Sequence, residues 1–537
     1  MSAPPPDSAP NERWPAIVLP AAGHWVWSAL SGLLLALAFP HHPGNPCAGI
    51  YSSGWAFVAL VPLIWNLSAL PLRAAFRHGW LTGLLFCLGS LYWVAHTQGG
   101  GAAVVGGTLL LAAYLGVYVG AFAAALGAVR RRWGTAAVLL APVLWTAQEF
   151  LLSLGELGFP WLMLAQTQAA HPSLIQCAEY TGAIGISFWL VAINALVYLS
   201  AASPWPRRHR AATTAVVALV VALPWLWGLS LLAEEPPGEG HIRVGLVQNN
   251  LGREKWQPGG LGRSFRSLTT LSRVAAASHP DLLVWPETAL PCHVARQPLC
   301  GQRLQGVVDE LGIPLLTGAP GVDGATGEPQ NAAFFLRPDG PQPESYAKMH
   351  LVPFGERTPF RDRIPFLRDI DWATLTGDLG PAEFGPGARR TIFSHPRGRF
   401  GVLICFEAVF PDLVRRTVAE GAEFLVNITN DSWFGPTAGP YQHAGLTVLR
   451  AVENRIAIAR CATSGISLFI DPLGRVSQAT GLAEAATRVG DLSLRERDTF
   501  YTRHGDVFAQ VSLLIAAIVL AWCRLRPDPF PRSWTDV

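Results

Sequence analysis

Three positions in this 537-residue chain carry reactive side chains that could do chemistry together. Glu287 follows the run 281–285, Cys405 ends the run 400–405, and Lys348 is one of only two lysines in the sequence. Short apolar runs of this kind are typical of strands that are buried on both faces. We therefore expect Glu287 and Cys405 to lie at or just beyond the ends of buried strands.

A thiol, a carboxylate and an ammonium group in one place make an acyl-transfer site. The carboxylate takes the thiol proton, the thiolate attacks a carbonyl carbon, and the ammonium stabilises the charge that develops. Taken singly, each residue is more typical of a core cysteine, a solvated glutamate or a surface lysine. Acyl transfer is therefore a prediction that depends on the three residues lying together.

Other classes of chemistry lack support in the sequence. The chain has no phosphate-binding glycine loop, no HExxH, CxxC or GxSxG pattern, and no histidine spacing that suits a metal. Its formal net charge of +3 gives no broad basic field for a polyanion. We expect no metal, no cofactor and no nucleic-acid partner.

At these positions the chain resembles the nitrilase superfamily, whose Glu-Lys-Cys triad occurs in the same chain order. The resemblance implies that Glu287 is the general base, Lys348 the oxyanion partner and Cys405 the nucleophile. Glu356, in the stretch Pro-Phe-Gly-Glu, matches the supporting carboxylate of that family.

Three more positions match functional residues of the superfamily, namely Trp256, Glu407 and Trp433, the last within the stretch Asn-Asp-Ser-Trp-Phe-Gly. Phe406 stands where many members have Tyr. A role for that hydroxyl group is therefore not carried over to this chain.

The composition points to a membrane protein. Half of the residues are hydrophobic and 14% are charged, against about 25% charged residues in an ordinary soluble chain. A membrane-spanning helix needs about 20 mostly apolar residues. Eight stretches approach this length, and we expect them to form a helical bundle: 24–40, 51–70, 79–97, 103–129, 134–153, 176–201, 211–232 and 507–524.

Arginine residues indicate the orientation of the bundle. Every second connection is basic, and the basic residues are Arg73, Arg77, Arg130, Arg131, Arg132, Arg207, Arg208, Arg210, Arg524 and Arg526. Basic connections face the cytoplasm, so both termini are expected there. The segment 233–506 then lies on the outer side, which is the periplasm for a bacterial inner membrane. The alternative, eight helices buried in a soluble protein, would make this alternation a coincidence.

The segment 233–506 alternates predicted strands and helices, which is typical of a layered α/β domain. Strands are expected at 241–248, 281–285, 313–317, 332–336, 400–405, 423–428 and 465–470, and helices at 263–278, 301–312, 411–421 and 440–456. The resemblance to nitrilases implies an αββα sandwich. The complete division is then a tail 1–23, a seven-span domain 24–232, the catalytic domain 233–506, an eighth span 507–524 and a tail 525–537.

A long Gly- and Pro-rich loop at 354–389 interrupts this alternation, and long loops in compact domains are usually functional or mobile. Its apolar residues Phe354, Phe360, Phe366 and Leu367 are expected to touch the bilayer or to cover an acyl chain.

Several side chains keep two interpretations at this stage. Cys292 and Cys300 can pair if the compartment is oxidising. Three carboxylates near the spans are either functional or simply pair helices and loop ends; they are Glu149, Glu156 and Glu179. Cys461 is expected in the protein core.

The membrane segments together with the triad resemble the apolipoprotein N-acyltransferase family, a membrane-embedded branch of the superfamily. This resemblance implies a ping-pong transfer of a fatty acyl chain, through a thioester, from a phospholipid to the N-terminal amine of a diacylglyceryl-cysteine apolipoprotein. We expect a monomer. One alternative is a membrane-tethered amidase that hydrolyses a small amide with the same triad. Another is a transporter or receptor whose outer domain only binds a ligand.

Overall fold

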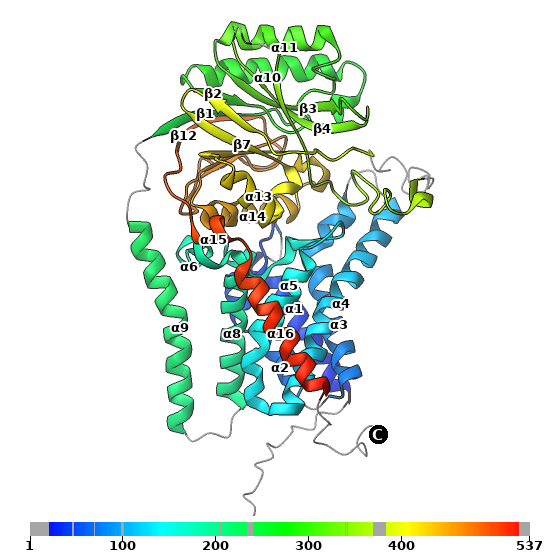
Figure 1. Ribbon diagram of the computed structural model, residues 1–537, viewed down its shortest axis with the longest axis vertical. Coiled ribbons are helices and arrows are strands. Elements are labelled where there is room, and N and C mark those ends of the chain that lie inside the picture. Colours follow the sequence, from blue (N-terminus) through cyan, green and yellow to red (C-terminus); the bar gives the residue numbers. More distant parts are fainter. Residues whose placement is uncertain are drawn as a thin grey trace, which may run out of the picture.

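The structure is a computed structural model that describes residues 21–45, 48–68, 70–97, 101–202, 207–233, 240–338, 340, 342–368 and 383–525. Cys47, residues 369–382 of the expected loop and most of both expected tails lie outside the described residues. Figure 1 shows two parts stacked along the long axis, a layered α/β domain above a bundle of long helices.

Within the described residues, the α/β domain contains two six-stranded sheets. The first has the strand order β12-β1-β2-β3-β4-β5, and the second has the order β11-β10-β9-β8-β7-β6. The strands are β1 (His241–Gln248), β2 (Leu282–Val284), β3 (Leu315–Val322), β4 (Pro329–Leu336), β5 (Glu344–Ala347), β6 (Ile392–His395), β7 (Gly398–Ile404), β8 (Phe424–Thr429), β9 (Ile458–Ala462), β10 (Leu468–Ile470), β11 (Val476–Ser477) and β12 (Ala486–Ser493).

Parallel pairing fixes the centre of each sheet. Strands β1, β2 and β3 are parallel, as are β7, β8 and β9, and the outer strands are antiparallel. Parallel central strands are buried on both faces, which explains why their sequences are continuous apolar runs rather than alternating ones.

The helices of this domain cover the outer faces of the two sheets. They are α10 (Gly260–Ala276), α11 (Pro298–Leu311), α13 (Pro411–Ala419) and α14 (Gly439–Asn454). One apolar core lies between the sheets, and another lies between the first sheet and α10 and α11. Helices α13 and α14 lie between the second sheet and the bundle (Figure 1). The order of layers is αββα, which confirms the expected nitrilase-like α/β domain.

The bundle is formed by helices before and after this domain. They are α1 (Ala21–Ala38), α2 (Val61–Asn66), α3 (Leu72–Leu91), α4 (Gly101–Trp133), α5 (Ala141–Leu152), α6 (Pro172–Ile175), α7 (Ala178–Thr181), α8 (Ala183–Ala202), α9 (Arg207–Ala233) and α16 (Val507–Leu525), and the short helix α15 (Phe500–His504) leads from the α/β domain into α16. Among the described residues, five helical stretches are long and apolar enough to cross a membrane: 101–133, 135–152, 183–201, 208–233 and 507–525.

Eight continuous spans were expected, and that expectation is only partly supported. The stretch 51–70 is not one helix, because it divides into a 3-10 helix, η2 (Ser53–Phe57), and α2. Pro62 lies in the first turn of α2, where its missing N–H is tolerated. Gly182 likewise ends α7 with a φ of +67°, so the stretch 176–201 is also divided.

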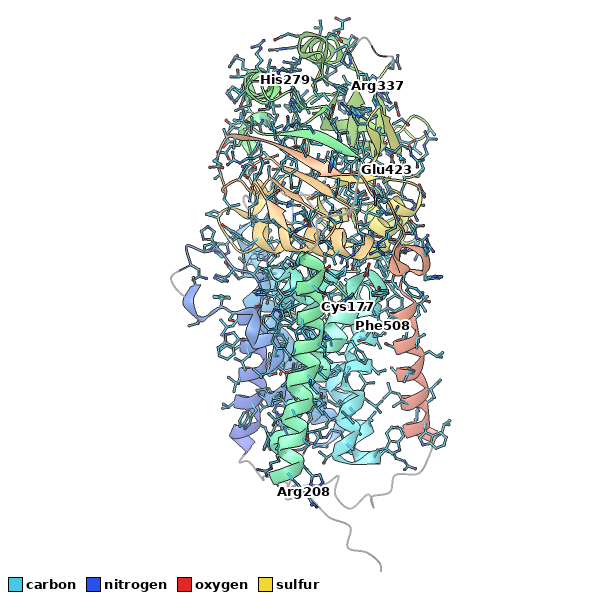
Figure 2. The ribbon with its side chains drawn as sticks, turned by 90° about the vertical axis from the view of Figure 1, so that its left-hand side faces the viewer. Cys177, Arg208, His279, Arg337, Glu423 and Phe508 are labelled. Atoms are coloured by element: carbon cyan, nitrogen blue, oxygen red, sulfur yellow. A yellow bond between two sulfur atoms is a disulfide. The ribbon has the colours of Figure 1, made fainter. Side chains whose placement is uncertain are left out.

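The basic ends of the long helices lie away from the α/β domain. Arg208, at the start of α9, is at the far end of the bundle in Figure 2, whereas His279, Arg337 and Glu423 lie in the α/β domain. Arg524 is in the last turn of α16, which also ends far from the sheets (Figure 1). This placement agrees with the arginine alternation in the sequence.

The structure answers one question that the sequence left open, the pairing of Cys292 with Cys300, and confirms that Cys461 lies in the core. Cys292 and Cys300 form a disulfide at the start of α11. Cys461 on β9 is fully buried, and its thiol donates to the carbonyl oxygens of Val247 and Val284.

Candidate active site

The triad residues follow the carboxyl ends of strands in the two facing sheets. Glu287 lies after β2, Lys348 directly follows β5, and Cys405 directly follows β7. Strand β5 is antiparallel to β4, which is antiparallel to β3, so β5 runs in the same direction as β2. The carboxyl ends of these strands therefore share one edge, which is where α/β sheets place their ligand sites.

Lys348 lies in a buried cluster with two carboxylates. Its Nζ donates to Glu356 over 2.9 Å and lies 3.9 Å from Oε1 of Glu287. The Asn331 side chain, from β4, donates to both carboxylates, over 2.7 Å to Glu287 and 3.1 Å to Glu356. The second oxygen of Glu356 accepts from the backbone N–H of Val352 over 2.8 Å. Asn331 and Glu356 thus hold Glu287 and Lys348 in a fixed arrangement.

The cluster has a defined charge pattern. Burial disfavours the ammonium form of Lys348, but Glu356, Cys405 and Glu287 together raise its pKa above the ordinary value. Burial raises the pKa of Glu287 above its ordinary value, although Lys348 opposes this shift. A charged lysine beside a carboxylate whose pKa is raised is the arrangement that a general base near neutral pH requires.

Cys405 is partly exposed and has a φ of +53°, in the left-handed region that residues other than glycine rarely adopt. Burial of the sulfur raises the pKa of the Cys405 thiol, Glu287 raises it further, and Lys348 opposes both. The resting thiol is therefore protonated at neutral pH. It needs a neighbouring base to become a nucleophile, and Glu287 is the carboxylate with the largest electrostatic effect on it.

Glu407 connects the two strand ends that carry Lys348 and Cys405. Its Oε1 accepts from the Tyr346 hydroxyl and from the Met349 backbone N–H, each over 2.7 Å. Its Oε2 accepts from the Ile404 backbone N–H over 2.8 Å. Because Tyr346 and Met349 flank Lys348, and Ile404 precedes Cys405, this fully buried carboxylate sets the spacing between the lysine and the thiol.

Trp256 and Trp433 lie at the surface rather than in the buried cluster. Trp256 is in the 3-10 helix η7 (Arg253–Trp256) and is 56% exposed, and Trp433 is in η11 (Asp431–Phe434) and is 36% exposed. A Cβ placed on Gly252 would be 3.2 Å from the Cβ of Ser432, so these two short helices are neighbours. The side chains of both tryptophans are thus accessible to a substrate, and neither belongs to the buried cluster.

Lys255 is a polar residue of the site region that sequence reasoning did not select. Its side chain is buried, and its Nζ makes no hydrogen bond to the described residues. Burial lowers its pKa to about 8, while Glu287 and Glu254 oppose the shift. Its position next to Trp256 and its rarity in this chain are the signals that would have pointed to it.

Cys405 is also connected to the helical bundle. Phe406, the next residue, packs against Phe159 and Trp161, with ring centroids 6.2 Å apart in each pair. Both partners come from the connection between α5 and α6. The ring of Phe406 therefore makes an apolar contact with the helical bundle, at the position where many nitrilases have a Tyr.

Comparisons with known proteins agree with this two-part architecture. Residues 31–196 match the family described as Apolipoprotein N-acyltransferase N-terminal domain, and residues 243–500 match the family described as Carbon-nitrogen hydrolase. An apolipoprotein N-acyltransferase from Geobacter metallireducens is 36% identical over 511 residues, which cover 93% of this chain and 94% of that protein. The chain belongs to the apolipoprotein N-acyltransferase family.

The chain is also similar to another apolipoprotein N-acyltransferase and to a solved structure. The one from Chlorobaculum tepidum is 32% identical and covers 93% of this chain and 96% of that protein. A solved nitrilase-superfamily structure from Saccharomyces cerevisiae is 20% identical, with a TM-score of 0.37, and covers 48% of this chain and 91% of that chain.

The carboxylates expected near the spans of this apolipoprotein N-acyltransferase family member have structural partners. Glu179 pairs with Arg455 and Arg497 over 3.0 and 2.8 Å, which joins the bundle to the α/β domain. Glu149 accepts from the Trp145 side chain and the Leu164 backbone N–H. Glu156 accepts from the Phe360 backbone N–H over 2.6 Å, and so connects the bundle to the loop after Glu356.

Replacing Glu407 by Gln is expected to destabilise the fold by about 1–3 kcal/mol, because the new amide N–H₂ faces backbone and hydroxyl donors. Acyl transfer should fall as well, because the spacing between Lys348 and Cys405 is lost. Thermal unfolding and acyl transfer in detergent measure both effects. The control is Glu310→Gln, at an exposed ion pair with Arg273, which should leave stability nearly unchanged because solvent screens such a pair. Equal effects for the two variants would show that Glu407 has no special role.

Proposed function

We propose that this protein transfers a fatty acyl chain from a phospholipid to the N-terminal amine of a diacylglyceryl-cysteine apolipoprotein. The observation that carries the proposal is the buried cluster of Glu287, Lys348 and Glu356 beside Cys405. The contact of Phe406 with Trp161 brings this cluster next to the membrane part of the chain. Membership of the apolipoprotein N-acyltransferase family supports the nature of the acceptor.

The first half-reaction makes a thioester. Glu287 takes the proton of the Cys405 thiol, and the sulfur attacks the ester carbonyl carbon of the phospholipid. Lys348 stabilises the oxyanion of the tetrahedral intermediate. When the intermediate collapses, the carbon–oxygen bond of the ester breaks, and Glu287 returns the proton to the departing oxygen. The products are a lysophospholipid and an acyl chain on Cys405.

The second half-reaction makes an amide. The neutral N-terminal amine of the acceptor attacks the thioester carbonyl carbon, and Glu287 takes a proton from the nitrogen. Collapse of the second intermediate breaks the carbon–sulfur bond, and the released sulfur recovers the proton. A covalent intermediate lets the lysophospholipid leave before the apolipoprotein binds, so two bulky substrates share one site. Trp256 and Trp433, at the surface near Lys255, are proposed to contact these substrates.

We further propose eight membrane crossings, with 24–232 as the seven-span domain, 233–506 as the catalytic domain and 507–524 as the last span. The divided stretch 51–70 crosses as a broken segment. Irregular backbone is tolerated at membrane depth where it is buried in protein, and here Asn194 accepts from the N–H of Leu60 and donates to the carbonyl of Ala56. The protein is proposed to act as a monomer in a bacterial inner membrane.

The catalytic domain is proposed to face the periplasm, and impermeant thiol labelling of intact cells tests this orientation. A cysteine introduced by Leu299→Cys, at a position that is 83% exposed on α11, should be labelled from outside. A cysteine introduced by Arg208→Cys, at the end of α9 that lies far from the catalytic domain (Figure 2), should be labelled only after the inner membrane is opened. The reverse pattern would place the catalytic domain in the cytoplasm.

Apolar residues of the loop that begins at Phe354 are proposed to contact the bilayer. Phe354 is 50% and Phe366 is 66% exposed, and the loop lies near the upper ends of α3 and α4 (Figure 1). Burying one such side chain in lipid contributes roughly 1.5–3 kcal/mol. Replacing both by Ser should therefore raise the apparent KM for vesicle phospholipid by about 10-fold or more. Leu299→Ser, on the far side of the domain, is the control, and equal KM values would contradict the proposal.

Product analysis tests the proposed function itself. Purified protein in phospholipid vesicles is given a peptide that carries an N-terminal diacylglyceryl-cysteine. The proposal predicts a peptide heavier by one acyl chain, with lysophospholipid formed in equal amount. Release of free fatty acid with an unmodified peptide would instead indicate a hydrolase. A peptide whose N-terminal amine is acetylated should receive no acyl chain, because its nitrogen cannot attack the thioester.

A further inference from the structure

The N-terminal part of α14 lies between the nucleophile and the helical bundle. Its residues Gln442 and His443 are adjacent in sequence and nearly fully buried. A Cβ added to Gly439, which starts the helix, would lie 3.0 Å from the ring of Trp93 in the bundle. The helix therefore packs directly against the bundle at this point, with no room for a larger side chain at position 439.

Gln442 makes every hydrogen bond that its side chain allows, and all partners are in the bundle. Its Oε1 accepts from the indole N–H groups of Trp93 and Trp161, over 3.0 and 2.9 Å. Its Nε2 donates to the carbonyl oxygens of Ser90 and Pro40, over 3.0 and 3.3 Å. An amide with two donors and two accepting lone pairs has no further capacity, so the bundle fixes this side chain completely.

His443 makes contact with the nucleophile on the other side of the helix. Its Nε2 lies 3.1 Å from the backbone carbonyl oxygen of Cys405, and its Nδ1 lies 2.9 Å from Oδ1 of Asp431. Arg460 pairs with the second oxygen of Asp431 over 2.8 Å. Carboxylate and carbonyl oxygens only accept, so the imidazole donates from each nitrogen that carries a proton. The Trp161 ring also packs on the imidazole, with centroids 5.2 Å apart.

Cys405 needs such support because of its backbone conformation. A φ of +53° is strained at a residue other than glycine, and it persists only where the surroundings enforce it. The His443 contact is made to the carbonyl of this strained residue. Loss of the contact would let the backbone relax and would move the sulfur away from Glu287 and Lys348.

We propose that His443 is a positioning residue that holds Cys405 in its reactive backbone conformation, and that the helical bundle sets the place of His443 through Gln442. The helical bundle thereby helps to hold Cys405 in place, in addition to anchoring the protein in the membrane. The proposal rests on Cys405 being the nucleophile. It is tested by thiol alkylation, which reports the state of the sulfur even if acyl transfer follows another route.

Two substitutions at position 443 separate the two contacts of the imidazole. In His443→Gln the amide N–H₂ takes the place of Nε2 and can still donate to Cys405. In His443→Asn the amide N–H₂ takes the place of Nδ1, so it reaches Asp431 but not Cys405. The full-length variants are compared by the rate of Cys405 alkylation with iodoacetamide, located by peptide mass, and by kcat and KM for acyl transfer.

The proposal predicts that His443→Asn lowers the alkylation rate and kcat by about 10²-fold, with KM unchanged, and that His443→Gln recovers most of this loss. Gln442→Leu should reproduce the loss, because it breaks the link to the bundle. The matched control is Gln176→Leu, which removes the Gln176 contacts with Arg455 and the Leu473 carbonyl at another point of the same interface; it should leave alkylation within about 3-fold of the unaltered protein.

Three results would overturn the proposal. One is an equal loss in His443→Asn and His443→Gln, which would indicate that His443 serves only Asp431 and the core. Another is normal alkylation in Gln442→Leu. The third is a loss in Gln176→Leu as large as that in Gln442→Leu, which would indicate general loosening of the interface. If His443→Asn does not fold, the comparison of Gln442→Leu with Gln176→Leu decides the proposal alone.

Discussion

Replacing Cys405 by Ala is expected to lower acyl transfer by about 10⁴-fold or more, which is the scale of effect seen when a covalent nucleophile is removed. The residue follows β7 directly, and its sulfur is electrostatically coupled to both Glu287 and Lys348. The loss of one small side chain at a partly exposed position should leave thermal unfolding nearly unchanged. Transfer to the lipopeptide and a melting curve measure the two effects separately.

Cys461 provides the matched control for this prediction. It is also a cysteine of the second sheet, but its thiol is buried and donates to the carbonyl oxygens of Val247 and Val284. Cys461→Ala should therefore retain transfer while losing some stability. Transfer that persists in Cys405→Ala above about 1% of the normal rate would show that another group accepts the acyl chain.

Replacing Lys348 by Met is expected to have the second-largest effect, on stability as well as on rate. The ammonium is the cation that separates Glu287 from Glu356, at 3.9 and 2.9 Å. Removing one partner from a buried ion pair destabilises a fold by about 3–5 kcal/mol. Losing the oxyanion stabiliser should also lower acyl-enzyme formation by about 10²–10³-fold. Unfolding and single-turnover acylation are the measurements.

A second substitution separates these two consequences of Lys348→Met. Glu356→Gln removes one of the two carboxylates, and its single amide oxygen can replace either the oxygen that accepts from Asn331 or the one that accepts from Val352. The double variant should therefore regain part of the lost stability, since interacting sites are not additive. Its rate should stay low, because the ammonium is still absent. Recovery of the rate together with stability would mean that Lys348 only maintains the fold.

The grouping of Glu287, Lys348 and Cys405 was predictable from sequence, because each follows an apolar run or is a rare residue type. Asn331 was not predictable in this way. It lies inside β4, and only the pairing of β4 with β3 and β5 brings its amide to both carboxylates. His443 and Gln442 were missed for a related reason. Polar residues on a helix are ordinarily solvent-facing, and the side-chain partners of these two lie 12 to 402 residues away.

The limits of fold prediction have similar physical causes. The parallel strands β1, β2, β7 and β8 were found because burial on both faces gives continuous apolar runs. Strand β12 was missed, since it is an edge strand with charged residues and pairs only with β1. The stretch 51–70 has the composition of a span, but its break depends on Asn194, which satisfies the interrupted backbone from another helix. Such distant contacts leave no periodic signal.

The most direct test of the account is the intact mass of the purified protein after exposure to phospholipid without any acceptor. A thioester mechanism predicts that the mass increases by one acyl chain, that peptide mapping places the chain on Cys405, and that hydroxylamine removes it. Adding the diacylglyceryl-cysteine peptide should return the protein to its original mass as the peptide gains the chain. Transfer to the peptide with no acylated protein at any time would contradict the account and indicate direct transfer between the two substrates.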